Sequence, residues 1–301
     1  MKNKYSYALL ALLAIMVFSC NEKQKPKPEK VKAEVKTANN PAMVPPAWIR
    51  KRVEKAQKEL LKTEAGSILW KGMEAHGGLA TWFGNGALSF RFKYMPVDGG
   101  TVRDSYQTIN TWSNKARHYS VKDSTDQFGW TGEKAWIKTK DSTSFAYDTK
   151  FWALTPIYLM GHPFVLDGEG VNLELLPPTE FKGKKNDVVK VTFAAGTGDA
   201  PDDYYILQFD AESHLLTATR YIVSYPEYFK DGGHAPEKIM EVGELVNVDG
   251  VLLPSSLKTH WLSDEGGLGE HITNIEISDL SFIKELPEDF YEVPENAKIL
   301  E

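Results

Sequence analysis

The chain has 301 residues, of which 42% are hydrophobic and 12% aromatic, and its formal net charge at pH 7 is −6. The first 44 residues carry five excess positive charges, so residues 45–301 carry −11. Such an acidic region repels a phosphate backbone, which argues against nucleic acid as a partner. It is long enough for one large domain or two small ones.

The first 19 residues are typical of a signal peptide. Lys2 and Lys4 precede an apolar stretch at 7–18 that is shorter than the roughly 20 residues needed to span a bilayer. The following Val-Phe-Ser-Cys at 17–20 resembles the bacterial lipobox, which implies cleavage before Cys20, a diacylglycerol on its sulfur and an acyl group such as palmitate on its new amino group. By the same resemblance Asn21 favours the outer membrane. An incidental cysteine after an ordinary signal peptide is the alternative.

The sequence of residues 20–44 predicts a lipidated cysteine followed by a disordered tether. Six Lys, three Glu and several Pro leave this segment without the apolar surface that a core needs. Its net charge of +3 attracts anionic headgroups weakly, although a plain spacer explains it equally simply. The folded part is therefore expected at 45–301, as a single domain.

The folded part begins with a helical pattern. Apolar residues recur at spacings of three and four from Trp48 onward, with a bend expected near Ala65-Gly66 and an end at Gly77-Gly78. His76 is expected to interact with the carbonyl groups and dipole at this helix end, and a catalytic role for it is the weaker alternative.

From residue 87 the apolar period changes to two. Leu88, Phe90, Phe92 and Tyr94 alternate with polar residues, which predicts a strand with one covered face. Asp249-Gly250 predicts a type I′ hairpin turn. About eleven strands in succession, with few helices between them, predict antiparallel pairing. Beyond residues 87–95, strands are expected at 101–112, 116–122, 127–132, 134–140, 171–177, 187–194, 203–210, 214–225, 237–248, 251–262 and 271–282.

The segment 151–170, FWALTPIYLMGHPFVLDGEG, interrupts the strands. It is uncharged up to Asp167 and contains two prolines, which favours one or two short helices lying across the sheet. This segment is either an insertion that fills the core or a lid over an apolar cavity. His162 within it is expected to satisfy a buried carbonyl rather than to contact a ligand.

The order of signal, long helix, strands, apolar insertion and further strands resembles the LolA/LolB-like superfamily, in a lipid-anchored branch. The closing IEISDLSFIKELPEDFYEVP at 275–294 and the AHGG at 75–78 with Trp82 are similar to elements of such domains. The resemblance covers roughly residues 47–294. It implies an α+β fold in which a large curved antiparallel sheet, a half-barrel, carries an N-terminal helix and a short helical lid across its concave face.

Motifs for catalysis are missing from the sequence. The seven histidines are scattered, with no H-E-x-x-H or G-x-S-x-G motif. Asp199, Asp202 and Asp203 lack the ordered spacing of a calcium loop and are expected to form a solvated acidic loop. We therefore expect no enzyme activity, no metal and no cofactor.

The leading hypothesis is a lipid-anchored envelope protein that binds a lipid or acyl chain between the sheet and the insertion, as a carrier or periplasmic chaperone. The alternative is a surface interaction or scaffold module with a filled core and an unknown protein partner. A cavity of about 300 Å³ or more would favour the first hypothesis. The expected ligand-binding residues are Phe90, Phe92, Tyr94, Trp152, Leu154, Tyr158, Leu159, Phe164 and Leu166.

Overall fold

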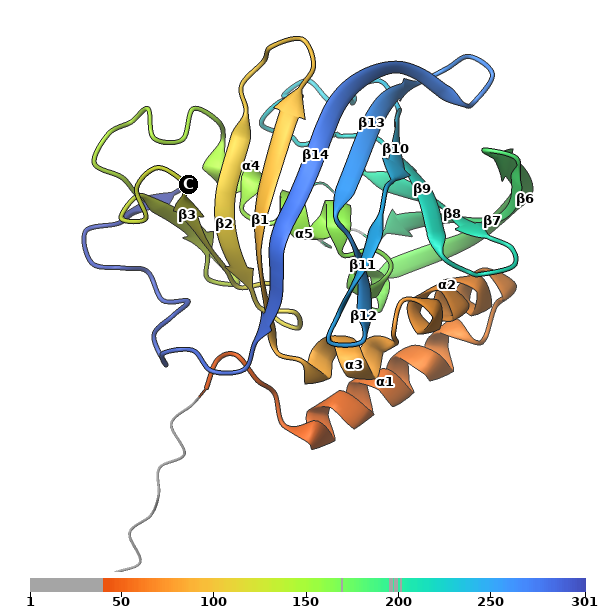
Figure 1. Ribbon diagram of the computed structural model, residues 1–301, viewed down its shortest axis with the longest axis horizontal. Helices are drawn as coiled ribbons and strands as arrows, with labels where there is room; N and C mark the ends of the chain where they lie inside the picture. The colour runs from red at the N-terminus through yellow and green to blue at the C-terminus, as the bar shows by residue number, and fades with distance from the viewer. Residues whose placement is uncertain (1–39, 169, 195–196, 198–199, 201) are drawn as a thin grey trace, which may run out of the picture. The chain divides into compact units, whose positions relative to one another are not determined.

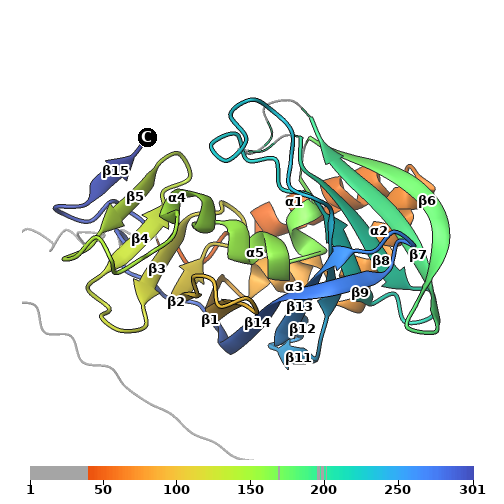
Figure 2. The ribbon, with the colours of Figure 1, turned by 90° about the horizontal axis from the view of Figure 1, so that it is seen from above.

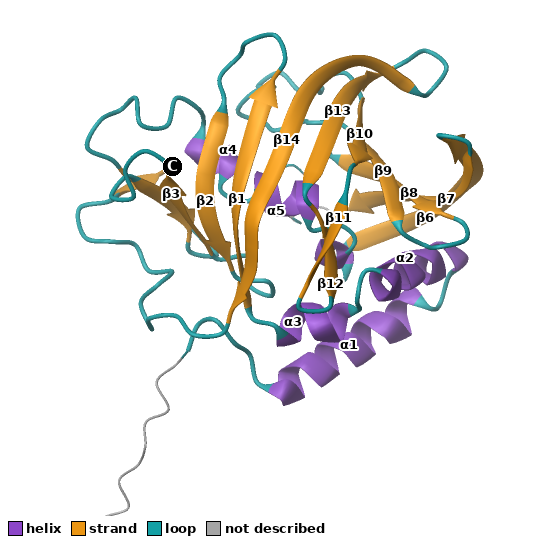
Figure 3. Cartoon of the chain, in the orientation of Figure 1, coloured by secondary structure: helices purple, strands orange, loops and turns teal. Residues whose placement is uncertain are grey.

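An open antiparallel sheet forms the frame of the protein (Figure 1, Figure 3). The computed structural model describes residues 40–301 except 169, 195–196, 198–199 and 201. In this described part, thirteen strands pair in one sheet. Their order across the sheet is β15 (Lys298–Leu300), β5 (Ala135–Lys138), β4 (Gln127–Trp130), β3 (Ala116–Ser120), β2 (Arg103–Ile109), β1 (Ala87–Pro96), β14 (Leu268–Ile283), β13 (Ser256–Leu262), β10 (Lys238–Val242), β9 (Leu216–Tyr221), β8 (Tyr204–Asp210), β7 (Lys184–Phe193) and β6 (Val171–Phe181).

The period of two predicted for the first strand is present in β1. Leu88, Phe90 and Phe92 are buried, whereas Arg91 faces the other side and forms an ion pair with Asp104 of β2, with 2.8 Å between Nη2 and Oδ2. Such cross-strand pairs hold the register of neighbouring strands while the apolar face enters the core. A separate hairpin, β11 (Leu245–Val248) and β12 (Val251–Pro254), turns at the predicted Asp-Gly pair.

The sheet curls around the apolar insertion (Figure 2). We call β15, β5, β4 and β3 the first wing and β9, β8, β7 and β6 the second wing. Between the wings, across the concave face, lie α4 (Thr149–Trp152), α5 (Thr155–Met160) and the 3₁₀ turn η1 (Phe164–Leu166). The predicted curved antiparallel half-barrel with a short helical segment across its concave face is thus confirmed.

The predicted N-terminal helix is two helices, and a third, short helix follows it along the same end of the sheet (Figure 1). They are α1 (Pro46–Leu60), α2 (Glu64–Ala75) and α3 (Leu79–Gly84). The break comes before Ala65-Gly66, because the Thr63 hydroxyl accepts a hydrogen bond from the Gly66 amide at 3.1 Å and caps α2. The carbonyl of Leu60 also approaches Gly66 so closely that a side chain there would collide with it.

The Ala75-His76-Gly77-Gly78 element joins the helices to the small hairpin. His76 caps the end of α2, as expected, with Nδ1 2.8 Å from the Gly72 carbonyl oxygen. The His76 carbonyl accepts a hydrogen bond from the Leu252 amide of β12 at 2.8 Å. Gly77 has a φ of +114° and lies against the carbonyl of Gly250, so both its conformation and its contact require a residue without a side chain.

The packed part of the chain begins before the predicted boundary at residue 45. Ala42 is fully buried, and the Asn110 side-chain amide donates to the Pro41 carbonyl at 2.8 Å. Residues 40–44, which belong to the predicted tether, therefore contact the β-domain. The described residues belong to one compact unit. The predicted signal peptide, Cys20 and the tether up to residue 39 lie outside the described residues.

Replacing Gly77 by Ala tests this junction. We expect Gly77→Ala to lower the free energy of unfolding by roughly 2–4 kcal/mol, because it adds a collision with Gly250 to the cost of a positive φ. Gly99→Ala is the matched control, since Gly99 has a φ of +82° in open space and should lose only about 1 kcal/mol. Equal losses in urea unfolding would contradict the role given to the contact.

Candidate functional site

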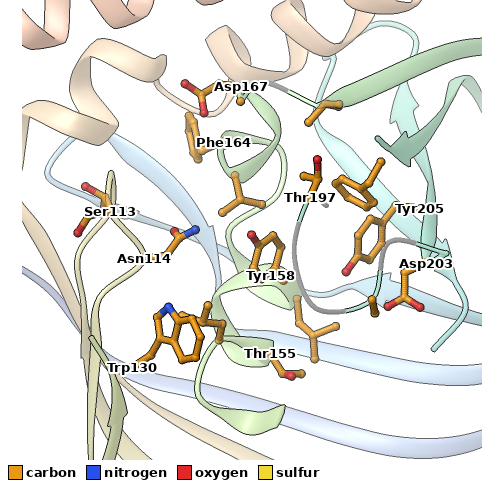
Figure 4. Close-up of a pocket in the computed structure, with 18 of the residues that line it drawn as sticks. Ser113, Asn114, Trp130, Thr155, Tyr158, Phe164, Asp167, Thr197, Asp203 and Tyr205 are labelled. Carbon is orange, nitrogen blue, oxygen red and sulfur yellow. The ribbon is translucent and has the colours of Figure 1, made fainter. Parts of the chain in front are cut away.

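A pocket of about 540 Å³ lies beside the insertion (Figure 4). One wall is α4, α5 and η1, and the opposing walls come from the loops and strands of the two wings. Most of its side chains are apolar or aromatic. The lining residues are Arg52, Phe83, Thr111, Trp112, Ser113, Asn114, Trp130, Gly132, Lys150, Phe151, Leu154, Thr155, Tyr158, Leu159, Phe164, Val165, Asp167, Gly168, Val171, Phe193, Thr197, Ala200, Asp203, Tyr205, Tyr221, Ile222, Val223 and Tyr225.

Four of the nine residues that the sequence suggests for ligand binding line this pocket. They are Leu154, Tyr158, Leu159 and Phe164, all from the insertion. Five others belong to the core instead: three are strand residues that the insertion covers, and two are residues of the insertion itself that pack into the core. These five are Phe90, Phe92, Tyr94, Trp152 and Leu166.

Ring contacts show how the insertion covers the core. The rings of Tyr94 and Trp152 meet edge to face with centroids 5.0 Å apart, and Phe164 stacks on Trp82 at 4.9 Å. Such aromatic pairs bury large apolar areas and fix the orientation of the segment. The segment is therefore packed on its sheet side and borders the pocket with its remaining side chains.

The aromatic residues of the two wings are the part of the site that the sequence did not indicate. Trp130 comes from the end of β4 and Tyr205 from β8, and they face the pocket from opposite sides with Tyr158 between them (Figure 4). In the sequence, both are aromatic residues within predicted strands, and this was the only indication of a role in the site. That they face each other across the pocket depends on the curl of the sheet, which local sequence patterns do not predict.

An ion pair closes one end of the pocket. Arg52 of α1 binds Asp167 through both carboxylate oxygens, with Nε–Oδ2 at 2.7 Å and Nη2–Oδ1 at 3.1 Å. The hydrogen bond to Asp167 raises the pKa of Arg52. Because the pair is bidentate and Asp167 is only 7% exposed, the two charges largely compensate each other.

Asp203 contributes a carboxylate on the side of the second wing. Its Oδ1 accepts hydrogen bonds from the backbone amide of Ser224 at 2.6 Å and from the Ser224 hydroxyl at 2.7 Å. Burial raises the pKa of Asp203 despite these bonds. The predicted acidic loop is therefore partly folded at Asp203, whereas Asp199 lies outside the described residues.

His118 fastens the insertion to the sheet. Its Nε2 donates to the carbonyl of Ala153, between α4 and α5, at 2.9 Å, and Nδ1 then accepts from the Ser105 hydroxyl at 3.3 Å. Burial lowers the pKa of His118 to about 3, so the ring is neutral. Because Ser105 and His118 are 4% and 0% exposed and neither lines the pocket, this Ser–His pair positions the insertion and is closed to a substrate.

His162 differs from the sequence expectation. Neither ring nitrogen of this buried side chain has a hydrogen-bond partner among the described residues, so the ring does not satisfy a carbonyl. It meets the Tyr205 ring edge to face at 4.7 Å, and aromatic packing thus takes the place of a hydrogen bond. Burial lowers the pKa of His162 to about 3.

Within the described ranges, no three His, Cys, Asp or Glu side chains gather closely enough to hold a metal ion. Within the same residues, the helices are all too short or too polar to cross a bilayer.

Neither a protein-family model nor a curated protein sequence matches the chain. Among solved structures, a LolA superfamily protein from Nitrosomonas europaea shares 12% identity, covering 76% of this chain and 97% of that one, with a TM-score of 0.49. A putative outer membrane lipoprotein-sorting protein domain from Vibrio parahaemolyticus shares 10%, covering 81% and 97%, with a TM-score of 0.46. A DUF1329 family protein from Desulfovibrio piger shares 10%, covering 81% and 97%, with a TM-score of 0.41.

The LolA/LolB-like resemblance expected from the sequence is accompanied by similarity to these solved structures, at identities of 10–12% and TM-scores of 0.49 or less. At these identities the likeness concerns the course of the chain and says nothing of a ligand.

Acid should destabilise the protein through buried histidines, above all His118 and His162, whose folded pKa is about 3. A histidine whose folded pKa of about 3 lies below its unfolded value of about 6.5 contributes stability above pH 6.5, and loses it as the pH falls toward 3. When the pH falls from 8 to 5, each of these two histidines should lower the free energy of unfolding by about 2 kcal/mol.

The variant His162→Leu should therefore lose about 2 kcal/mol less than the wild type over the same pH range, measured by urea unfolding. The control His234→Leu removes an exposed histidine and should keep the wild-type loss. An unchanged pH dependence in His162→Leu would contradict the prediction.

Proposed function

We propose that this protein binds a hydrophobic or amphipathic ligand, a lipid or an acyl chain, in the pocket between α5 and the two wings. The observation that carries the proposal is the pocket itself. Its volume of about 540 Å³ falls within the roughly 300–1,000 Å³ of small-molecule sites, and its walls are mainly aromatic and aliphatic. Burial of apolar ligand surface against such walls is favourable by about 25 cal/mol per Å².

The same pocket weighs against the alternative of a scaffold with a filled core. The insertion fills the space over Phe90 and Phe92, yet a cavity is left on its other side. A module that only displays its outer surface needs no such space, whereas a carrier does. We therefore propose a role in holding or handing over a ligand without transforming it, as a carrier or periplasmic chaperone.

The proposed location follows from the N-terminal sequence. A lipid on Cys20 would anchor the protein in the cell envelope, at the outer membrane, because two or more acyl chains bind a bilayer stably. Residues 21–39 would connect this anchor to the β-domain. A ligand taken from or returned to the same membrane is consistent with this tethered position.

The proposal is tested on the full chain carrying Cys20→Ser, so that no acyl group of the protein's own can occupy the pocket. Solvent extraction and mass spectrometry of the purified protein should release a lipid, and a fluorescent fatty acid should bind. Leu154→Trp should weaken this binding at least about tenfold, because an indole would occupy volume that the ligand needs.

The control is Leu175→Trp on β6, at a side chain that is 42% exposed and does not line the pocket. It should bind the probe like the parent. If no lipid is extracted and the parent binds no probe, the proposal is wrong. Equal binding by the parent and Leu154→Trp would place the ligand elsewhere.

A further inference from the structure

Lys238 is a half-buried cation at the first position of β10, next to the second wing. It pairs across strands with Tyr221 of β9 and Trp261 of β13. Its Nζ lies 5.8 Å from the centroid of the Tyr221 ring and 5.2 Å from that of Trp261. Ring faces attract a cation within about 6 Å, so the two rings hold the ammonium in place.

The N–H donors of the Lys238 ammonium are not used by the described residues. It makes no hydrogen bond and no ion pair with any other described residue. A lysine carries three donors, and burial of a charge is costly unless it is paired. Burial accordingly lowers the pKa of Lys238. An anionic oxygen at this position would offset that cost.

The cations that line the pocket among the described residues are already paired, whereas Lys238 lies beside the lining. Arg52 is bound to Asp167 through two hydrogen bonds, and Lys150 binds Glu227 with 2.6 Å between Nζ and Oε1. Their charges are therefore committed within the protein. Lys238 differs from both in this respect.

Lys238 also lies next to the cavity. Tyr221, whose ring it covers, lines the pocket, and so do the following residues Ile222 and Val223. A ligand whose chain lies along α5 would thus reach Lys238 with one end. The flexible four-carbon stem of a lysine allows the ammonium to meet such a group.

Asp203 is the nearby charge that opposes this arrangement, because it favours a cationic ligand. Its Oδ1 is already used by the two hydrogen bonds from Ser224, and burial disfavours its charged form. Lys238 makes no such hydrogen bonds among the described residues, although the Asp203 carboxylate attracts its ammonium. The balance of unsatisfied groups therefore favours an anionic head group.

We propose that the ligand is an acidic amphiphile whose anionic oxygens bind Lys238 while its acyl chain occupies the pocket. This inference rests on the proposed function and adds the sign of the head-group charge to it. The shared chemistry is a negatively charged oxygen group on a hydrocarbon chain, as in a fatty acid or a phospholipid phosphate.

Four probes of matched chain length test the inference on the full chain with Cys20→Ser. They are hexadecanoic acid, a dihexadecanoyl phosphatidylglycerol, hexadecanol and hexadecyltrimethylammonium. Both anionic probes, or one of them, should bind at least about tenfold more tightly than hexadecanol. The stronger of the two identifies the source of the head group.

Lys238→Met keeps the length of the stem and removes the charge. It should weaken the preferred anionic probe about tenfold and leave hexadecanol unchanged, whereas Lys238→Arg should retain most of the affinity. The matched control is Lys190→Met, because Lys190 also covers one aromatic ring, that of Tyr204 at 5.2 Å, but neither residue lines the pocket. It should bind every probe like the parent.

The results that would overturn this inference differ from those that would overturn the proposed function. Hexadecanol binding without preference for either anionic probe would overturn this inference and leave the proposed function standing. Tighter binding of hexadecyltrimethylammonium, or equal weakening of all probes in Lys238→Met, would also overturn it. Failure of the parent to bind any of the probes would overturn the proposed function itself.

Discussion

The cover that α4, α5 and η1 provide for the concave face is the constraint on which the rest of the structure depends. A sheet curled this strongly has one apolar face that water must not reach. The insertion covers this face by packing Trp152 and Phe164 into the core. The hydrogen bond from His118 to the Ala153 carbonyl fixes the position of the insertion on the sheet. Because the helices are short and the wings stand apart, the cover is one layer deep. The space beyond it, between the wings, is the pocket.

Much of this architecture could be predicted from local sequence patterns, because each pattern reflects a local cause. The alternation from Leu88 to Tyr94 shows a strand with one covered face, and the uncharged run from Phe151 to Leu166 shows a segment that is not a strand. The curl of the sheet could not be predicted in this way. Trp130 and Tyr205 lie on opposite wings, and only the accumulated twist and pairing of the strands between them brings the two to one cavity.

The same distinction explains the candidate site. A period of two tells which side chains point inward, but it does not tell whether the space in front of them is filled. Phe90 and Phe92 point inward and are covered by the insertion, whereas Leu154, two residues after the buried Trp152, borders the cavity. His162 follows the same rule: the sequence shows a histidine in an apolar segment, but only packing against Tyr205 decides that it has no polar partner.

The charged groups at the two ends of the pocket differ in how far they are neutralised. At the α1 end the carboxylate of Asp167 is neutralised by Arg52 through two hydrogen bonds, so a ligand gains little from placing a charged group there. Near the end of β9, two ring faces and the Asp203 carboxylate attract the Lys238 ammonium, but among the described residues it forms no ion pair or hydrogen bond that would neutralise it. In the proposed mode of binding, an amphiphile therefore has its head group at β9 and β10 and its chain along α5, toward the neutralised pair. Aromatic and aliphatic side chains make up most of the lining, and they accept a hydrocarbon chain in many positions, so the specificity of the proposed site depends mainly on the head group.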